Sequence, residues 1–164
     1  MLVVAEQYHV SLYLEDAVKL LLDSRDERPL EFMAEYFNTM QRGDHVLLRE
    51  FSYCNATPYN RCCLMRRAWD ALKAFDGQRP VSAADMCQLL GLLCPDFSLD
   101  LVHEAARLTE PVPDVEGRPP RYEAARVLVH LRFLFYFAEF LKAPLDPNPI
   151  LAVANTSLVS VSRL

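Results

Sequence analysis

Residues 28–37, with the sequence RPLEFMAEYF, decide how the first part of the chain folds. Pro29 suits the first turn of a helix, and Met33 and Phe37 then recur at the four-residue spacing of one helical face. Gly43 follows the apolar positions and is typical of a helix end. The stretch therefore predicts an amphipathic helix that begins at Pro29 and ends before Gly43.

An upstream stretch predicts a helix that pairs with this one. Between residues 10 and 22 apolar side chains recur at helical spacing with charged ones between them, and the polar residues 23–28 form a connector. A hairpin of this size cannot bury enough apolar surface to fold alone. Its apolar face must therefore pack on another polypeptide or on the rest of the chain. The residues that we expect to bind a partner are Val10, Leu14, Val18, Leu21, Met33 and Phe37.

Capping residues predict three further helices downstream. Thr57 in front of Pro58 begins a helix that continues to about residue 75. Ser82, with Asp85 three residues later, is typical of a capping box, and Ser98 is typical of another N-cap. We expect the two helices that follow these caps to end near residues 93 and 108.

The last predicted helix, residues 121–142, is the longest and is dense in aromatic side chains. Its length suits a bilayer, but charged residues are spread along it, and charges at membrane depth are costly. We therefore expect a buried central helix. Its aromatic residues go all round it, so it is either enclosed on every side or meets a partner on one flank, and we favour enclosure with a partial interface. Residues 110–120 predict a proline-rich loop before it, and residues 143–164 an extended tail after it. Together these elements predict an all-α fold.

The composition excludes several classes of protein. The chain has 164 residues with 17 Lys+Arg against 22 Asp+Glu, an acidic balance that argues against a general nucleic-acid binder. Its four glycines are too scattered for a phosphate-binding loop, and no paired carboxylates or triad spacing indicate an enzyme. Five cysteines without a CxxC pair and four separated histidines favour neither a disulfide framework nor a metal site. We expect a non-catalytic protein of the reducing cytoplasm, without cofactor or metal, that binds neither nucleic acid nor membrane.

The first hairpin, with Glu31-Phe32 and Tyr36-Phe37 in its second helix, resembles the docking and dimerisation hairpin of protein kinase A type II regulatory subunits. In that family two hairpins form an antiparallel four-helix bundle whose groove takes an amphipathic helix. The resemblance implies that residues 8–42 bind a second hairpin, as a homo- or heterodimer, or a partner's amphipathic helix. The alternative, that the same side chains join the core of their own chain, stays open at this point.

Residues 43–142 resemble a pair of EF-hand halves. Aligning Val81 and Tyr122 with the apolar eighth position of each loop puts Asp85 and Arg126 at the last position. Calcium requires oxygen ligands at alternate loop positions and a closing bidentate Glu, and neither loop supplies them. We expect an EF-hand-like helical core that binds no calcium.

Four motifs, EYFN at 35–38, REF at 49–51, ATPYNR at 56–61 and LLCPDF at 92–97, resemble the centriolar satellite-associated tubulin polyglutamylase complex regulator family in order and spacing. The resemblance covers about residues 8–142. It implies a non-catalytic protein of centriolar satellites, cilia or axonemal microtubules that organises partners, including the machinery that adds glutamate to tubulin tails. Family members continue into a long polar region beyond these motifs, and regulation that resides there is not implied for this sequence.

Two functions follow from this resemblance. The first is a ciliary or axonemal microtubule-associated adaptor that docks a partner through the hairpin. The second is an accessory regulatory subunit of a tubulin polyglutamylase complex at centriolar satellites. Arg61, Arg66 and Arg67 share one predicted helix and could meet acidic tubulin tails or a partner's carboxylates, although a merely solvated helix face is the simpler explanation.

Overall fold

The structure is a computed structural model that describes residues 9–74, 80–113 and 119–142, with side chains up to residue 136. Helices dominate these residues, and they contain no strand, so the predicted all-α fold is confirmed. The helices are α2 (Val10–Ser24), α3 (Pro29–Arg42), α4 (Phe51–Asn55), α5 (Pro58–Ala74), α6 (Ala83–Leu93), α7 (Leu99–Arg107) and α8 (Ala124–Lys142). The predicted tail, residues 143–164, lies outside the described residues.

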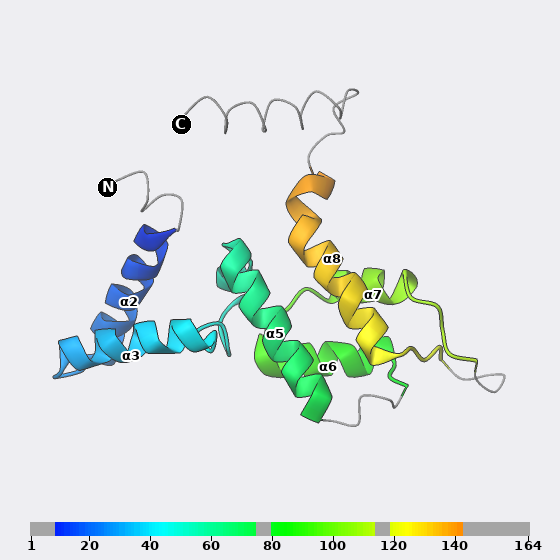
Figure 1. The fold of residues 1–164 in the computed structure, drawn as a ribbon, viewed down its shortest axis with the longest axis horizontal. Helices are drawn as coiled ribbons and strands as arrows, with labels where there is room; N and C mark the ends of the chain where they lie inside the picture. Colours follow the sequence, from blue (N-terminus) through cyan, green and yellow to red (C-terminus); the bar gives the residue numbers. More distant parts are fainter. Residues whose placement is uncertain (1–8, 75–79, 114–118, 143–164) are drawn as a thin grey trace.

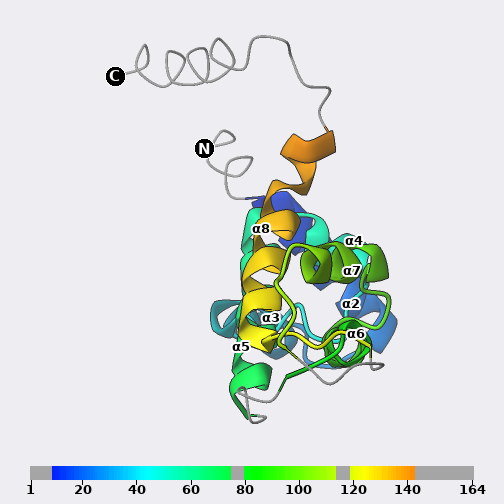
Figure 2. The ribbon, with the colours of Figure 1, turned by 90° about the vertical axis from the view of Figure 1, so that its right-hand side faces the viewer.

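The helices form two groups on either side of α5. Figure 1 shows α2 and α3 together on one side of α5, and α6, α7 and α8 on the other. After a quarter turn, the core helices face the viewer and the hairpin of α2 and α3 lies behind them (Figure 2). Within the core, α8 packs against both α5 and α7, and α6 packs against α5 and α7. The hairpin therefore projects from a helical core that it does not help to enclose.

Local signals in the sequence place several helix ends correctly. The backbone N–H of Asn60 donates to the Thr57 hydroxyl at 3.0 Å, which caps α5. Ser82 and Asp85 form the expected capping box at the start of α6. Gly43 ends α3 with a φ of 78°, a left-handed conformation that glycine adopts without strain.

Three local expectations differ from the structure. Ser98 occupies the N-cap position of α7, but its side chain makes no capping hydrogen bond. The five-residue helix α4 was not predicted, and a distant carboxylate supports its start, because the Phe51 N–H donates to Asp96 Oδ1 at 2.7 Å. The last helix begins at Ala124, three residues later than expected, because Tyr122 pairs with another segment instead of continuing the helix.

The core contains tightly packed apolar side chains from α4 to α8. Its largest fully buried members include Phe135, Leu64, Met86 and Leu90. The final helix is buried on one side only, since Phe133 on its other side is 55% exposed. Of the two expectations for its aromatic residues, full enclosure is therefore wrong for the described part. No helix among the described residues combines the length and the apolar content that spanning a bilayer requires.

A short antiparallel bridge joins the two halves of the core. Val81 N–H donates to the Tyr122 carbonyl at 2.9 Å, and Tyr122 N–H donates to the Val81 carbonyl at 2.8 Å. In the comparison with EF-hands, these are the two residues that occupy the apolar eighth position of the two EF-hand-like loops. Asp85, at the last position of the first loop, has its carboxylate engaged with the Ser82 N–H at 2.8 Å. The EF-hand-like character of the core stays a prediction, to which this pairing adds support.

Candidate functional site

The hairpin has an inner face that packs on itself. Tyr13 and Ala17 of α2 and Tyr36 of α3 are buried together. Met33 and Phe37, two of the residues expected to bind a partner, are half-buried against this cluster. The ring of Phe37 meets the ring of Tyr36 edge to face with centroids 5.3 Å apart. Both side chains therefore contribute to the hairpin's own packing.

The outer face of α2 presents a row of aliphatic side chains, which we call the α2 row and which consists of Val10, Leu14, Val18 and Leu22. These four residues recur every fourth position and are between 37% and 70% exposed. Three of them were predicted to bind a partner, and Leu22 was not. The predicted residue Leu21 is half-buried beside the row. The apolar surface of α2 is thus not sealed by the described part of its own chain.

Four of the six predicted binding residues line two neighbouring hollows and not one groove, and Leu21 and Met33 line neither hollow. Val10 and Phe37 line a hollow of about 500 Å³ between the start of α2, the end of α3 and Tyr59 of α5. Leu14 and Val18 line a shallower hollow of about 460 Å³ along the outer side of α2. The α2 row connects the two hollows, so together they form one candidate docking surface.

A charged cluster fixes the hairpin to the core. The guanidinium of Arg49 donates to both carboxylate oxygens of Asp16, to Oδ2 at 3.1 Å. The Tyr36 hydroxyl donates to the same Oδ2 at 2.7 Å and lies 3.2 Å from the Tyr53 hydroxyl. Arg49 also lies over the Tyr53 ring, 4.0 Å from its centroid. One carboxylate thus ties α2 to α3 and to the segment around α4.

The ionisation of this cluster follows from its burial and its partners. Burial raises the pKa of the Asp16 carboxyl, but hydrogen bonds from Arg49 and Tyr36 outweigh burial and leave the pKa below its ordinary value. Burial, together with the neighbouring Tyr53 and Asp16, raises the pKa of the Tyr36 hydroxyl. Asp16 is therefore charged and Tyr36 protonated at neutral pH, as the hydrogen bonds between them require.

A second, uncharged cluster attaches α2 to the start of α5. The Tyr13 hydroxyl lies 2.8 Å from the Thr57 hydroxyl and donates to Asn60 Oδ1 at 2.9 Å. His45 Nε2 lies 2.9 Å from the same oxygen, and Asn60 Nδ2 donates to the Tyr53 carbonyl at 2.8 Å. Because Asn60 is fully buried and both its amide oxygen and its amide nitrogen are hydrogen-bonded, this residue is a structural junction and not an exposed binding group.

The three arginines expected to meet acidic partners have different surroundings. Arg61 is 3% exposed and donates to the carbonyls of Asn55 at 2.9 Å and Tyr136 at 3.3 Å, which places it inside the chain. Arg67 pairs with Asp44 at 2.7 Å and donates to the Arg42 carbonyl at the end of α3. Arg66 donates to that carbonyl at 3.3 Å but remains exposed. The structure therefore leaves only Arg66 of the three well placed for an acidic partner.

Sequence reasoning missed the pairing of Asp16 with Arg49. It treated Asp16 only as one of the charged residues between the apolar positions of α2, and it quoted Arg49 within a family motif without giving it a role. The two residues are 33 positions apart, so helical periodicity does not relate them. A usable signal was Tyr36, which flanks the predicted apolar face of its helix and whose hydroxyl requires a hydrogen-bond partner once it is buried.

Comparisons with known proteins identify relatives of the hairpin and of most of the chain. Residues 3–43, which include α2 and α3, match the family described as the CSTPP1 N-terminal domain. Proteins named centriolar satellite-associated tubulin polyglutamylase complex regulator 1 match a longer stretch. The one from Homo sapiens is 37% identical over 141 residues, 82% of this chain. The chain is a homologue of this regulator family.

Relatives of the same name from other organisms match as well. The regulator from Mus musculus is 36% identical over 143 residues, 84% of this chain, and that from Danio rerio is 30% identical over 169 residues, 94% of this chain. The chain spans 41% of the human relative, 42% of the mouse relative and 50% of the zebrafish relative. No solved structure matches the chain. The resemblance to this family is thus confirmed, whereas the likeness of the hairpin to kinase regulatory subunits stays a prediction.

Proposed function

We propose that the chain is a non-catalytic accessory subunit of a tubulin polyglutamylase complex, associated with centriolar satellites, and that it binds a partner of that complex through the α2 row. The names of its relatives support the complex and the location, because they describe regulators of such a complex and not enzymes. The observation that carries the docking role is the α2 row itself, a run of exposed aliphatic side chains on a hairpin that the core holds in place.

The chemistry of the α2 row fits another amphipathic helix. Aliphatic side chains at every fourth position form a continuous ridge on a helix, and a partner helix with the same spacing buries such a ridge efficiently. Glu15, Lys19 and Asp23 line the same hollow as Leu14 and Val18, so the apolar ridge has a charged margin. An apolar centre with a polar rim is the usual anatomy of a protein interface. The partner is therefore either an amphipathic helix or the same hairpin of a second copy.

A dedicated ciliary or axonemal adaptor would use the same surface. The two functions predict different effects when the protein is removed from the cell. An accessory subunit is needed for glutamylation, so its loss lowers polyglutamylated tubulin in cells whose axonemes keep their normal architecture. A structural adaptor is needed for assembly, so its loss first removes its neighbours from the axoneme. The family names favour the accessory subunit.

Replacing Leu14 by Arg tests the docking role directly. This change puts a charge in the centre of the α2 row, where burial against a partner helix would be costly. We expect Leu14→Arg to lose co-purification of the polyglutamylase subunits while the circular dichroism and melting of the chain stay unchanged. Asn38→Arg, at an exposed polar position of α3, adds the same charge as a control and should keep the partners. Retention of all partners by a folded Leu14→Arg chain would refute the docking role of the row.

A further inference from the structure

A second hollow surface lies away from the α2 row, between α5 and α8. A hollow of about 290 Å³ is lined by Met65, Arg66 and Trp69 of α5 and by Val129 and Arg132 of α8 among others. A hollow of about 510 Å³ continues from it along α8. We call this continuous surface the α5/α8 groove; its lining residues are Cys62, Met65, Arg66, Trp69, Leu128, Val129, Arg132, Phe133 and Tyr136.

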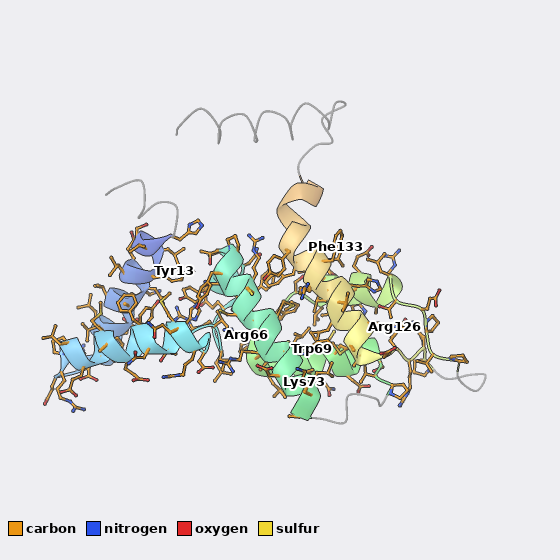
Figure 3. All side chains as sticks on the ribbon, in the orientation of Figure 1. Tyr13, Arg66, Trp69, Lys73, Arg126 and Phe133 are labelled. Carbon is orange, nitrogen blue, oxygen red and sulfur yellow. The ribbon has the colours of Figure 1, made fainter. Side chains whose placement is uncertain are left out.

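The walls of the α5/α8 groove are apolar and aromatic although they face solvent. Val129 is 57% exposed, and Phe133 is exposed to a similar degree. Trp69 is half-buried between the groove and the core. Figure 3 labels Trp69 on α5 and Phe133 on α8, with Arg66 nearer the start of α5. Exposed aromatic and aliphatic side chains gathered in a hollow are typical of a binding surface, where they take up an anchor side chain of a short segment.

The charge of the α5/α8 groove is opposite to that of the chain. The chain has a net charge of −5. The charged residues among the described lining of the groove are Arg66 and Arg132, both exposed, and that lining contains no carboxylate. Arg66 is positioned by its bond to the Arg42 carbonyl, which uses one of the five N–H donors of a guanidinium. The groove therefore presents two cations beside an apolar wall.

Tyr136 adds a donor of hydrogen bonds to this surface. It lines both hollows, and burial together with the neighbouring Cys62 thiol raises the pKa of its hydroxyl. A tyrosine hydroxyl is protonated at neutral pH even at its ordinary pKa of 10.0, so this one can exchange its contact with Cys62 for a hydrogen bond to a carboxylate. Arg66, Arg132 and Tyr136 thus all favour a ligand that carries negative charge.

We propose that the α5/α8 groove binds a short acidic peptide segment of another protein, with one apolar side chain of that segment against Trp69 and Val129, which line the same hollow, and its flanking carboxylates on Arg66 and Arg132. The charge complementarity and the apolar wall together specify this ligand, because a purely acidic chain leaves the wall uncovered and a purely apolar one leaves the arginines without an anionic ligand. The groove lies on helices other than α2 and α3, so this inference stands independently of the docking role of the hairpin.

Ligand binding to the groove can be followed by tryptophan fluorescence, since Trp69 is the one tryptophan of the chain. The probe is a synthetic peptide in which a single Phe is flanked by glutamates, added to the full chain at low ionic strength. We expect a saturable change in Trp69 emission that weakens with added salt, because salt screens exposed charges. The same peptide with every Glu replaced by Gln should produce no saturable change. Equal binding of the two peptides, or binding of neither, would overturn the proposal.

Charge reversal within the groove is compared with the same change outside it. Arg132→Glu should weaken binding of the acidic peptide about tenfold or more. Arg126→Glu reverses the same charge on the same helix at a position that pairs with Glu123 outside the groove (Figure 3), and it should bind normally. Val129→Glu, which puts a carboxylate on the exposed wall, is a second variant if Arg132→Glu does not fold. Undiminished binding by a folded groove variant would contradict the proposal.

Two further variants separate this surface from the alternatives. Leu14→Arg in the α2 row should leave peptide binding intact, so failure of one surface does not imply failure of the other. Leu151→Asp changes the apolar run at residues 150–154, which lies outside the described residues. Leu151→Asp without peptide is compared with the unchanged chain to which the peptide has been added. If both gave the same change in Trp69 emission, residues 150–154 would be the occupant of the groove, and the proposal of a separate partner would be wrong.

Discussion

The hairpin and the core are held together by different kinds of interaction. The core packs apolar side chains from five helices, and many of them are completely buried. The hairpin buries Tyr13, Ala17 and Tyr36, with partly buried apolar side chains packed against them. Its attachment to neighbouring segments uses hydrogen bonds, the Asp16–Arg49 ion pair and edge contacts of the Tyr13 ring with His45 and Tyr59. Burial in the core is spread over many residues, whereas the attachment of the hairpin depends on a few directional contacts.

This difference explains how one chain keeps an apolar surface available. If the hairpin were attached through the aliphatic face of α2, that face would be covered. Attachment through Asp16, on the other side of α2, and through Tyr13, beside Val10 at the edge of the row, fixes the helix and leaves the α2 row facing outward. A few polar contacts can thus orient the α2 row and leave it exposed, whereas attachment through apolar packing would have buried it.

The largest effect is expected in the core. Phe135 is fully buried and contacts the rings of Phe51 and Phe97 with centroids 5.7 Å away in each case. Phe135→Ala should lower the free energy of unfolding by about 3–5 kcal/mol. Phe133→Ala, on the exposed side of the same helix, should change it by less than about 1 kcal/mol. Equal losses in denaturant titrations of the two variants would show that α8 is enclosed on both sides.

The next largest effect is expected where the hairpin meets the core. Asp16→Asn removes the carboxylate that Arg49 and Tyr36 share and leaves a half-buried guanidinium poorly paired. The variant should lose about 2–3 kcal/mol of stability. Hydrogen exchange should rise in α2 and α3 while the core stays protected, because the loss is local to the attachment. Glu15→Gln removes the neighbouring exposed carboxylate and should leave exchange unchanged.

The pH dependence of the same contact has a defined sign. The folded chain lowers the pKa of the Asp16 carboxyl below its ordinary value of 3.8. Its contribution to stability is therefore complete above pH 3.8 and is lost as the pH falls through the folded pKa. The amide that Asp16→Asn introduces does not titrate, so unfolding titrations of the two chains should converge as the pH is lowered. A difference that stayed constant across this range would mean that the carboxylate charge is not what holds the hairpin.

The smallest effects are expected at two glycines, with opposite signs. Gly43 has a φ of 78°, and a Cβ there would collide with the guanidinium of Arg66. Gly43→Ala should therefore cost about 1–2 kcal/mol and loosen the junction of α3 with α5. Gly91 lies within α6 with nothing near an added Cβ, so Gly91→Ala should stabilise the core by about 0.5–1 kcal/mol. Melting temperatures of the two variants should move in opposite directions.

The parts of the fold that sequence could predict are those set by neighbouring residues. Thr57 caps α5 through a residue three positions on, and Ser82 pairs with Asp85 in the same way. Gly43 ends its helix through its own backbone freedom. Such signals lie within one turn of helix, so the sequence contains both partners at a recognisable spacing.

The parts that sequence could not predict depend on distant partners. Nothing in the local pattern distinguishes Asp16, which binds Arg49, from the exposed Glu15 beside it. Arg61 shares a helix with Arg66, yet the carbonyls of Asn55 and Tyr136 draw Arg61 into the interior. Helical periodicity assigns each residue to a face of its helix. It does not show which charged residue forms an ion pair, because the partner comes from a segment that is distant in the sequence.

The Val81–Tyr122 bridge implies an order in which the chain assembles. It joins segments that are separated by α6 and α7, and the bond from Arg61 to the Tyr136 carbonyl spans 75 residues. Contacts of such long range form only after the loops between them have closed, which slows their appearance. The contacts that fix the hairpin, between Asp16 and Arg49 and between Tyr13 and Asn60, span only 33 and 47 residues and can form earlier during synthesis. A nascent chain would therefore display its outward aliphatic ridge before the remainder has consolidated, which makes early engagement of a partner or a chaperone advantageous.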